Sequence, residues 1–508
     1  MAAVLWAESG QGARMDREGW GGKERNAIFL SAQHFSQSEK CAEVSLPIVM
    51  WSQCMRFLPP DDEVVLYETT FDKDLLGRVN LSKHISNIVE KIEDPLVIAL
   101  DGQWGTGKTY FLKRWVAAHT RDNGGTNTTI YFDSFANDYL SDPLVALVAA
   151  LSDRLQKDNR SKISKLKQTT NKLIKPATRL SLSIATAGAT TVLSDVGDLV
   201  AKAIEEEGKK AFDELWRREQ TRHQAMREFH NAIKALTITS GSGNVKPLVF
   251  VIDELDRCRP DYALEVLEVV KHFFAVPHVH FILGINSDVL ENSVKARYGI
   301  EIDAAAYLRK FISFSINLPK HIGDREKTLN ILAYVDFLGD AMQIPPHLLG
   351  EIRQQLRIIS RSTEISIRDI NKIMSRLNLL PSEAQDKNTY PGWRMVAITL
   401  IITIEIRPDY FRKITSKNLS EAELEQYFGA SKKYLSEFLE SGDWNPDQDR
   451  ELIYRYPIWK WMVSNGSSVS GEEKTQIARL FERYGHIESP VDYPEIIYDR
   501  WLSIFTFT

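Results

Sequence analysis

The chain has 508 residues, 43% of them hydrophobic, so it is long enough to form several domains with their own cores. Its formal net charge of -5 gives no overall attraction to DNA, RNA or an anionic membrane, and any such contact requires a local basic patch. The three cysteines, Cys41, Cys54 and Cys258, are too few and too widely spaced for a disulfide framework or a zinc cluster. This cysteine usage indicates a reducing, cytoplasmic compartment.

Residues 1–54 show no sustained helical or strand periodicity and are rich in Gly, Ser, Gln and charged residues. We therefore predict that this segment is disordered. The alternative is an over-extended start, with translation beginning at Met50 or Met55. The apolar residues Ala2–Trp6 are followed by charged residues and glycines, which is not the pattern of a signal peptide.

From Glu63 onward, short apolar runs alternate with amphipathic helical patterns. This layout is typical of an α/β domain built on a parallel sheet. We assign residues 55–320 to this core. The predicted strands are Pro95–Asp101, Thr129–Asp133, Leu248–Asp253, His280–Asn286 and Phe314–Leu318.

A segment at about 144–246 separates the second predicted strand from the third and is far longer than an ordinary crossover, so we predict a helical insertion. Its first part, residues 157–179, is basic and makes contact with nucleic acid possible. The following stretch, Leu180–Leu193, is too short and too rich in Ser and Thr to span a bilayer. A soluble amphipathic insertion is therefore favoured over a membrane contact.

Residues 321–508 read as a helical C-terminal region. The tryptophans Trp444, Trp459, Trp461 and Trp501 are interpreted as core residues, with an aromatic binding surface as the less favoured alternative. The predicted helices are Asp324–Met342, His347–Ile359, Ile367–Leu377, Trp393–Ile404 and Glu421–Ser441.

The strongest motif runs from Gly102 to Thr109, GQWGTGKT, and matches GxxxxGK[ST] between an apolar strand and a helix. In such a P-loop, backbone N–H groups converge on phosphate oxygens. Lys108 is expected to reach the β and γ phosphates, and Thr109 to bind Mg²⁺. The predicted nucleotide-binding residues are Gly102, Gln103, Trp104, Gly105, Thr106, Gly107, Lys108, Thr109 and Tyr110.

A second motif, LVFVIDE, ends a buried strand with two adjacent carboxylates, Asp253 and Glu254. Asp253 is predicted to hold Mg²⁺ and Glu254 to deprotonate the attacking water. A carboxylate placed to activate water argues against a small-molecule kinase. Asn286, at the end of the next strand, is a candidate sensor of the γ-phosphate, and the alternative is a turn-forming residue with no catalytic role.

Together with DELDRCRP from Asp253 to Pro260, these residues resemble the KAP family of P-loop NTPases. The resemblance extends over about Asp72–Leu380 and includes segments beginning at Asp74, Phe281 and Tyr307. It implies an additional-strand NTPase core, ATP hydrolysis, and a role in signalling complexes or, in bacteria, in the exclusion of phage and plasmids. It also makes Arg368 the candidate sensor arginine, while Arg257, Arg259 and Arg309 remain further candidates for an arginine finger.

The sequence therefore predicts a Mg²⁺-dependent ATPase that acts as a nucleotide-driven switch or motor. ATP is favoured over GTP because no NKxD motif occurs near the expected strand. The alternative is a nucleotide-gated assembly or signalling scaffold whose hydrolysis is slow or incidental. A protein partner is expected in either case, and a homo-oligomer is possible.

Overall fold

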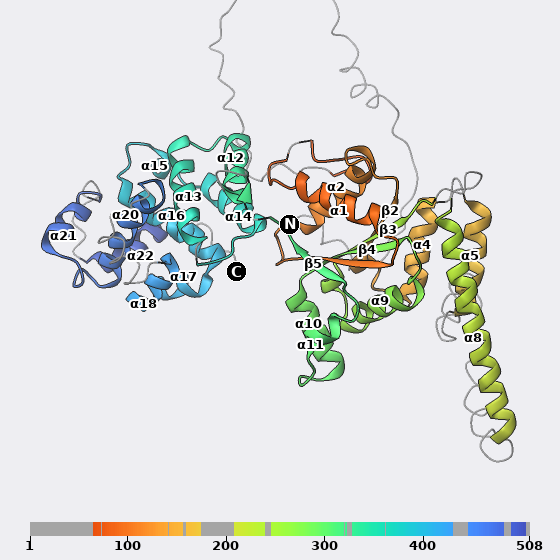
Figure 1. Ribbon diagram of the computed structural model, residues 1–508. Helices are drawn as coiled ribbons and strands as arrows, with labels where there is room; N and C mark the ends of the chain where they lie inside the picture. Colours follow the sequence, from red (N-terminus) through yellow and green to blue (C-terminus); the bar gives the residue numbers. More distant parts are fainter. Residues whose placement is uncertain are drawn as a thin grey trace, which may run out of the picture. The chain divides into compact units, whose positions relative to one another are not determined.

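A five-stranded parallel sheet organises the first half of the chain (Figure 1). The strands are β1 (Leu96–Asp101), β2 (Thr128–Asp133), β3 (Leu248–Asp253), β4 (Val279–Ile285) and β5 (Phe314–Asn317), in the order β2-β3-β4-β1-β5. The five predicted strands and the α/β fold class are thus confirmed. The computed structural model describes residues 64–72, 74–140, 142–155, 159–173, 208–238, 245–319, 321–322, 328–360, 362–429, 446–481 and 489–503. The predictions for residues 1–54 and for Leu180–Leu193 lie outside these residues.

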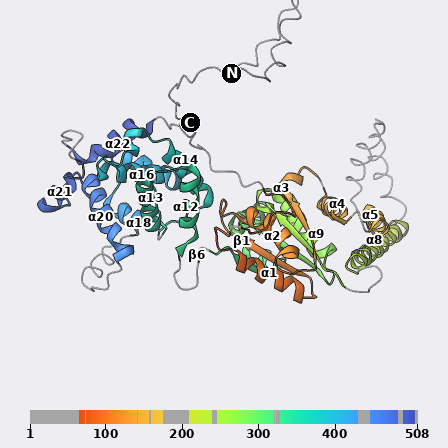
Figure 2. The same ribbon diagram turned by 90° about the horizontal axis from the view of Figure 1, so that it is seen from above.

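Helices cover both faces of the sheet (Figures 1 and 2), which is why β3 and β4 are apolar along almost their whole length. Residues of α1 (Val79–Lys91) and α2 (Lys108–Arg121) pack on one face with Ile98 and Val251. The other face packs Phe250 and Leu283 against α9 (Pro260–Phe273) and α10 (Ser287–Tyr298). The short elements α3 (Ser134–Asn137), η1 (Leu255–Arg257) and α11 (Ala304–Leu308) complete this part.

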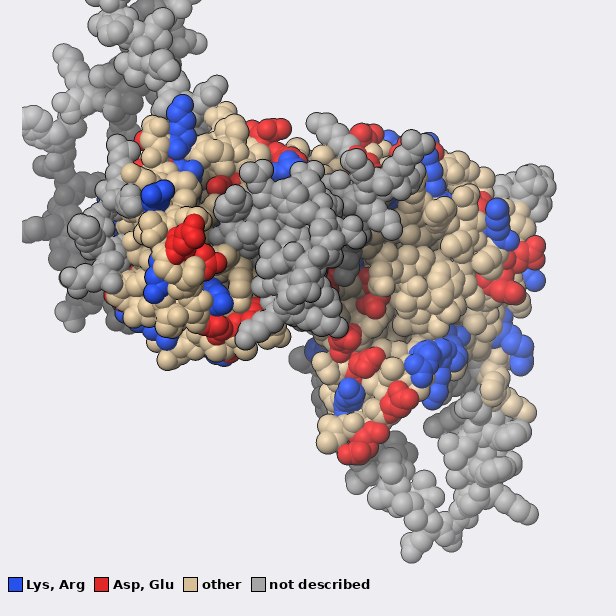
Figure 3. All heavy atoms as spheres, turned by 60° about the vertical axis from the view of Figure 1, so that its left-hand side comes forward, with Lys and Arg blue, Asp and Glu red and all other residues tan. Residues whose placement is uncertain are grey.

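Between β2 and β3 the described residues form three further helices: α4 (Pro143–Leu155), α5 (Arg160–Leu173) and α8 (Gly208–Leu236). The last two run side by side beyond the edge of the sheet (Figure 1). None of the described helices is long enough and apolar enough to cross a membrane. Acidic and basic side chains are interspersed over the face drawn in Figure 3, whereas α5 contains no Asp or Glu.

The C-terminal region is helical and has its own core, in which Trp459, Trp461 and Trp501 are buried. These tryptophans are core residues, as predicted, and Trp444 lies outside the described residues. The elements are α12 (Asn330–Met342), α13 (Pro346–Ile359), α14 (Ile367–Asn378), α15 (Ser382–Gln385), α16 (Pro391–Ile406), α17 (Pro408–Thr415), α18 (Glu421–Phe428), α20 (Pro446–Val463), α21 (Gly471–Ala478), η3 (Pro490–Asp492), α22 (Tyr493–Ile497) and η4 (Tyr498–Leu502). The domain boundary at residue 320 stays a prediction.

Two predicted helix ends in this region are wrong. The helix expected from Asp324 begins only at Asn330, because β6 (His321–Ile322) and β7 (Thr328–Leu329) pair as antiparallel strands before it. The helix expected to continue to Ser441 ends at Phe428, where Gly429 adopts a left-handed φ of 63° and terminates it. Residues 430–445 lie outside the described residues.

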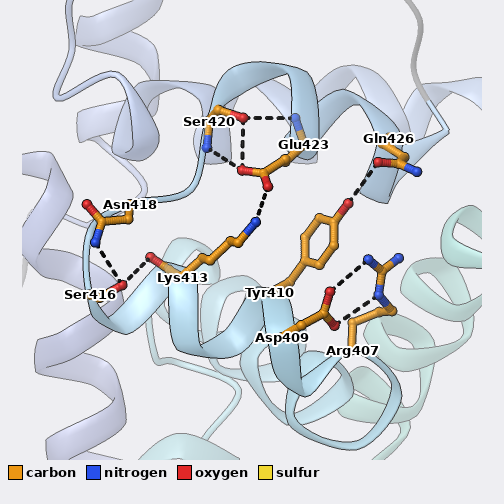
Figure 4. A network of polar contacts seen from close by, with 9 residues as sticks. All are labelled: Arg407, Asp409, Tyr410, Lys413, Ser416, Asn418, Ser420, Glu423 and Gln426. Atoms are coloured by element: carbon orange, nitrogen blue, oxygen red, sulfur yellow. Dashed lines mark hydrogen bonds and ion pairs between the residues drawn. The ribbon is translucent and has the colours of Figure 1, made fainter.

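A polar network fixes the packing of α17 against α18 (Figure 4). The Ser420 side chain accepts from the Glu423 N–H, and the Glu423 carboxylate accepts from the Ser420 N–H, which is a capping box at the start of α18. The same carboxylate pairs with Lys413 of α17. Tyr410 donates from its hydroxyl to Gln426 Oε1 at 3.1 Å. Hydrogen bonds therefore reinforce the apolar contact between these helices.

The buried His280 of β4 should make stability depend on pH. Burial lowers the pKa of His280 from 6.5 to about 4. Between about pH 6.5 and pH 4 the unfolded chain binds a proton at this histidine that the buried ring does not. The free energy of unfolding should therefore decrease as the pH is lowered, by up to about 1.4 kcal/mol per pH unit. Denaturant midpoints at several values between pH 7.5 and about 4.5 should fall less in His280→Leu than in the unmodified protein. His84→Leu, at an exposed site on α1, is the control. Equal losses in all three proteins would contradict the prediction.

Candidate functional site

The P-loop connects β1 to α2 and takes the backbone conformation that its glycines allow. Gly105 and Gly107 have left-handed φ values of 84° and 86°. The Gly102 N–H donates to the Ile285 carbonyl at 3.2 Å, and Asp101 Oδ1 accepts from the Ser287 N–H at 2.9 Å. These two bonds tie the start of the loop to the end of β4 and the start of α10.

Lys108, the first residue of α2, turns back into the loop. Its Nζ donates to the Gln103 carbonyl at 3.1 Å and also to the Gly102 carbonyl. Burial lowers the pKa of Lys108, and the nearby carboxylates, of which Asp256 has the largest effect, oppose that shift. The ammonium therefore lies within the loop, where a P-loop lysine meets phosphate.

Arg78 supports the loop from inside the protein, and the sequence did not identify it. Its side chain is 2% exposed, and its two terminal nitrogens donate to the Gly107 carbonyl at 2.8 Å and the Thr106 carbonyl at 2.7 Å. Burial lowers the pKa of Arg78 to about 10, still well above neutral, so the guanidinium is charged. An arginine that precedes a helix is normally exposed, so its place in the sequence gave no signal.

The Asp253 carboxylate ends β3 and is almost fully buried. Its Oδ2 accepts from the Tyr131 hydroxyl at 2.8 Å, its Oδ1 accepts from the Glu254 N–H at 2.9 Å, and Thr109 supplies a further side-chain hydrogen bond. Burial raises the pKa of Asp253, and these hydrogen bonds oppose the rise. Tyr131 lies in the middle of β2 and is a second site residue that the sequence did not identify. Only the pairing of β2 with β3 brings it to Asp253.

Thr109 and Asp253 have the chemistry of a Mg²⁺ site. A hydroxyl and a carboxylate are hard oxygen ligands, and a buried carboxylate is stabilised by a cation. Among the described residues no group of three or more His, Cys, Asp and Glu side chains could hold a metal by itself. In general, Mg²⁺ is bound by one or two carboxylates together with substrate phosphates.

Glu254 follows directly in a left-handed conformation, with φ 58°. A non-glycine residue in this region costs of order 1 kcal/mol or more, and such strain concentrates at functional sites. Its carboxylate pairs with Arg257 at 3.1 Å. Burial raises the pKa of Glu254, and Arg257 opposes the rise. The backbone thus turns Glu254 away from the direction of β3 at an energetic cost.

The Glu254 cavity, of about 270 Å³, brings most of the predicted site together. Glu254, Lys108 and Arg368 all line it, so three segments far apart in the sequence meet there. Its lining residues are Trp104, Gly105, Gly107, Lys108, Thr109, Tyr110, Asp253, Glu254, Asp256, Arg257, Gly284, Ile367, Arg368 and Asn371.

The start of α14 lies directly against the P-loop. The Ile367 N–H donates to the Gly105 carbonyl at 3.0 Å. A Cβ on Gly105 would lie 2.7 Å from Ser366 Oγ and 3.0 Å from the Arg368 Cβ. Ser366 caps α14 through a capping box with Asp369, which holds this end of the helix in place. Arg368 is therefore placed at the P-loop by the backbone of its own helix.

Asn286 lines a different cavity, of about 360 Å³, which we call the Asn286 cavity. This cavity also contains Gly102, Gln103 and Thr106, so it borders the P-loop, but Glu254 is not among its lining residues. The structure thus does not bring Asn286 and Glu254 into one cavity. A sensor role for Asn286 stays a prediction.

The other candidate arginines are placed differently from Arg368. Arg257 lines the Glu254 cavity and is paired with Glu254. Arg259 pairs with Asp138 and is mostly exposed. Arg309 follows α11, is exposed, and is not among the described residues that line either cavity. Only Arg257 and Arg368, of the four, border the Glu254 cavity.

Comparison with known proteins agrees with this geometry. The model of the KAP family P-loop domain matches residues 78–384, more than half of the chain. The chain belongs to the KAP family. It is therefore a nucleotide-binding P-loop NTPase. The resemblance to the KAP family that the sequence motifs indicated is confirmed. No curated protein matches the chain.

The KAP chain is also similar to solved structures at low identity. The ORC2 protein of Aeropyrum pernix in its ADPNP-ADP complexes is 12% identical, with a TM-score of 0.31, covering 72% of this chain and 73% of that chain. The ORC1 protein of Aeropyrum pernix in complex with DNA is 12% identical, with a TM-score of 0.29 and coverage of 87% and 95%. A RuvB variant of Thermotoga maritima is 13% identical, with a TM-score of 0.27 and coverage of 76% and 92%.

Gly284 should tolerate no side chain, because a Cβ there would lie 2.5 Å from Asp253 Oδ1 and 2.6 Å from Leu112 Cδ1. We expect Gly284→Ala to lower the free energy of unfolding by about 1–3 kcal/mol through overpacking. Displacement of Asp253 should also weaken Mg²⁺-dependent nucleotide binding at least tenfold, measured by calorimetry. The control is Gly350→Ala in α13, where a Cβ meets open space and should stabilise the helix by up to about 1 kcal/mol. An unchanged nucleotide affinity in Gly284→Ala would contradict this reading.

Arg78→Lys should weaken nucleotide binding although it keeps the charge. One ammonium cannot reproduce the two hydrogen bonds of the guanidinium fork. Loss of one charge-assisted bond, about 1.5–3 kcal/mol, corresponds to an affinity reduced tenfold or more. Arg297→Lys, at an exposed ion pair with Asp261, serves as the control in the same titration. Equal affinities for both variants would show that Arg78 does not shape the loop.

Proposed function

We propose that this protein binds ATP with Mg²⁺ and hydrolyses it. The observation that carries the proposal is the Glu254 cavity, where a carboxylate that can accept a proton faces the same space as the P-loop residues Lys108 and Thr109. An NTP-binding site without hydrolysis needs no such carboxylate. The absence of an NKxD motif in the sequence favours ATP as the substrate.

Each residue has a distinct part in the proposed reaction. Lys108 and the loop N–H groups bind the β and γ phosphates, and Thr109 and Asp253 hold Mg²⁺, which supplies positive charge against the phosphate oxygens. Glu254 accepts a proton from the water that attacks the γ-phosphorus, and its raised pKa makes it a stronger base than an exposed glutamate. Water forms the new P–O bond, the bond to the β-phosphate oxygen breaks, and ADP leaves. Arg368 stabilises the charge on the transferred group, and Asn286 senses the phosphate from the neighbouring cavity.

The contact between Gly105 and Ile367 supports a switch or motor function. A nucleotide that moves the P-loop backbone also moves the start of α14, whose apolar residues Ile370, Ile373 and Met374 are part of the C-terminal core. Hydrolysis would therefore change the position of the C-terminal helices, and with it the binding of a partner protein or of a second copy. The cysteine usage of the sequence favours a cytoplasmic location for this activity. In a bacterial host the activity would serve the exclusion of phage or plasmids, as the family resemblance implies.

Glu254→Gln should separate binding from hydrolysis. Loss of a general base lowers the rate by about 10²–10⁴. The ATP dissociation constant should change only a few-fold, since the phosphate-binding groups remain. Lys108→Ala should lose both affinity and turnover. Phosphate release and a fluorescent ATP analogue report the two quantities, and Glu301→Gln, at an exposed site, is the control. Hydrolysis at the unmodified rate in Glu254→Gln would refute the assignment.

The same variant tests the alternative function, a nucleotide-gated assembly scaffold. The contact of α14 with the P-loop favours this alternative as well, because it needs only nucleotide binding. Phage or plasmid exclusion and ATP-dependent oligomer mass should be compared between Glu254→Gln and Lys108→Ala. Activity retained in the first variant and lost in the second would support the scaffold over the switch that depends on turnover.

A further inference from the structure

α5 is a strongly basic surface helix whose apolar side is already occupied. Its sequence, RSKISKLKQTTNKL, has five Lys or Arg residues and no Asp or Glu. Ile163 and Leu166 are buried in one cluster with Phe229 and Ile233 of α8. The packing of α5 on α8 thus leaves only polar and basic side chains on the exposed surface of α5.

The basic residues lie in two rows along that surface. At about 100° per residue, Arg160 and Lys167 share one flank of the exposed surface, and Lys165 and Lys172 share the other. Members of each row are seven residues apart, which is about 10.5 Å along the helix. The surface between the rows, the polar crest, consists of exposed Ser161, Ser164, Gln168 and Asn171.

α8 adds positive charge to the pair. Arg227 and Lys234 lie on its exposed side, and Glu228 is the one acidic residue among the described side chains of α5 and α8. Glu228 pairs with Lys172 at 2.8 Å. Lys162 donates to the carbonyl of Ile238, two residues beyond the end of α8. The local charge is therefore strongly positive in a protein whose net charge is -5.

We propose that the α5–α8 pair binds duplex DNA, with α5 in the major groove. An α-helix with its side chains is about 10–12 Å wide and fits a major groove of about 12 Å. The two basic rows then face the phosphates of the two strands that border the groove. Ser, Asn and Gln on the polar crest are side chains that hydrogen-bond sugar, phosphate and base edges. The sequence indicates contact with nucleic acid only within residues 157–179 as a whole, whereas the packing of α5 on α8 selects the surface and the residues that face DNA.

Two other polyanions fit this surface less well. A helix that lies on a membrane inserts an exposed apolar face, whereas the apolar residues of α5 are buried against α8. Duplex RNA has a deep, narrow major groove that a helix cannot enter. None of the described α5 or α8 side chains lines the Glu254 cavity or the Asn286 cavity. DNA binding therefore goes beyond nucleotide hydrolysis, and a loss of DNA binding can be told apart from a loss of hydrolysis.

The test is fluorescence anisotropy with a labelled DNA duplex of about 30 base pairs at KCl concentrations between about 50 and 200 mM. The variant replaces Arg160, Lys165 and Lys167 by Ala. Because each phosphate contact contributes about 0.9 to the slope of log K against log salt, the slope should fall by about 2–3 in magnitude. Affinity at the lowest salt should fall at least tenfold.

The control variant replaces Lys83, Lys387 and Lys474 by Ala, three exposed lysines outside α5 and α8, and so has the same net charge. Its DNA affinity should stay within about twofold of the unmodified protein. Melting temperature and ATP hydrolysis should be unchanged in both variants, which shows that the fold is intact.

Parallel titrations use duplex RNA, single-stranded DNA and vesicles containing anionic lipid. We expect the protein to bind duplex DNA more tightly than any of these three ligands. The proposal is overturned if duplex DNA does not bind, if both triple variants lose affinity equally, or if RNA, single strands or vesicles bind more tightly than duplex DNA.

Discussion

The P-loop can present its N–H groups to phosphate only if its carbonyl groups, which point elsewhere, find their own donors. A buried carbonyl without a partner costs about 1–3 kcal/mol. In this protein Lys108 donates to the carbonyls of Gly102 and Gln103. Arg78 donates to those of Thr106 and Gly107, and the Ile367 N–H donates to that of Gly105. Three separate parts of the chain thus hold one loop in shape.

Because one of these donors comes from the C-terminal helices, the P-loop domain and the helical C-terminal region depend on each other. The donor for Gly105 comes from α14, which belongs to the helical core, and its position is fixed by the Ser366–Asp369 capping box. α14 packs on α12 and α16. A change in the P-loop therefore cannot remain local, because it either breaks the Gly105–Ile367 bond or moves a helix that is packed against others.

The second half of the site is built at the ends of β3 and β4. Both strands are buried, so Asp253 emerges in a desolvated position where only hydrogen bonds from Tyr131, Thr109 and the Glu254 N–H offset the burial of its charge. Gly284 of β4 leaves the space that this carboxylate occupies. Glu254, the residue after Asp253, has a left-handed backbone conformation that turns the chain away from the direction of β3. Strand pairing thus places Asp253, and the left-handed turn that follows β3 places Glu254.

The sequence by itself determined the five strands, the helical second half and the two phosphate-site motifs. These depend on local patterns: apolar runs of five to seven residues, 3.6-residue periodicity, and glycines and carboxylates at fixed spacing within a few residues. It could not determine where α12 begins, because the pairing of His321–Ile322 with Thr328–Leu329 competes with helix formation. Only the tertiary structure decided that Arg78 and Tyr131 belong to the site and that Arg368 shares a cavity with Glu254 while Asn286 lines another. Those relations join residues that are 28 to more than 100 positions apart in the sequence. The packing of the sheet and helices creates them, and no local sequence pattern reports that packing.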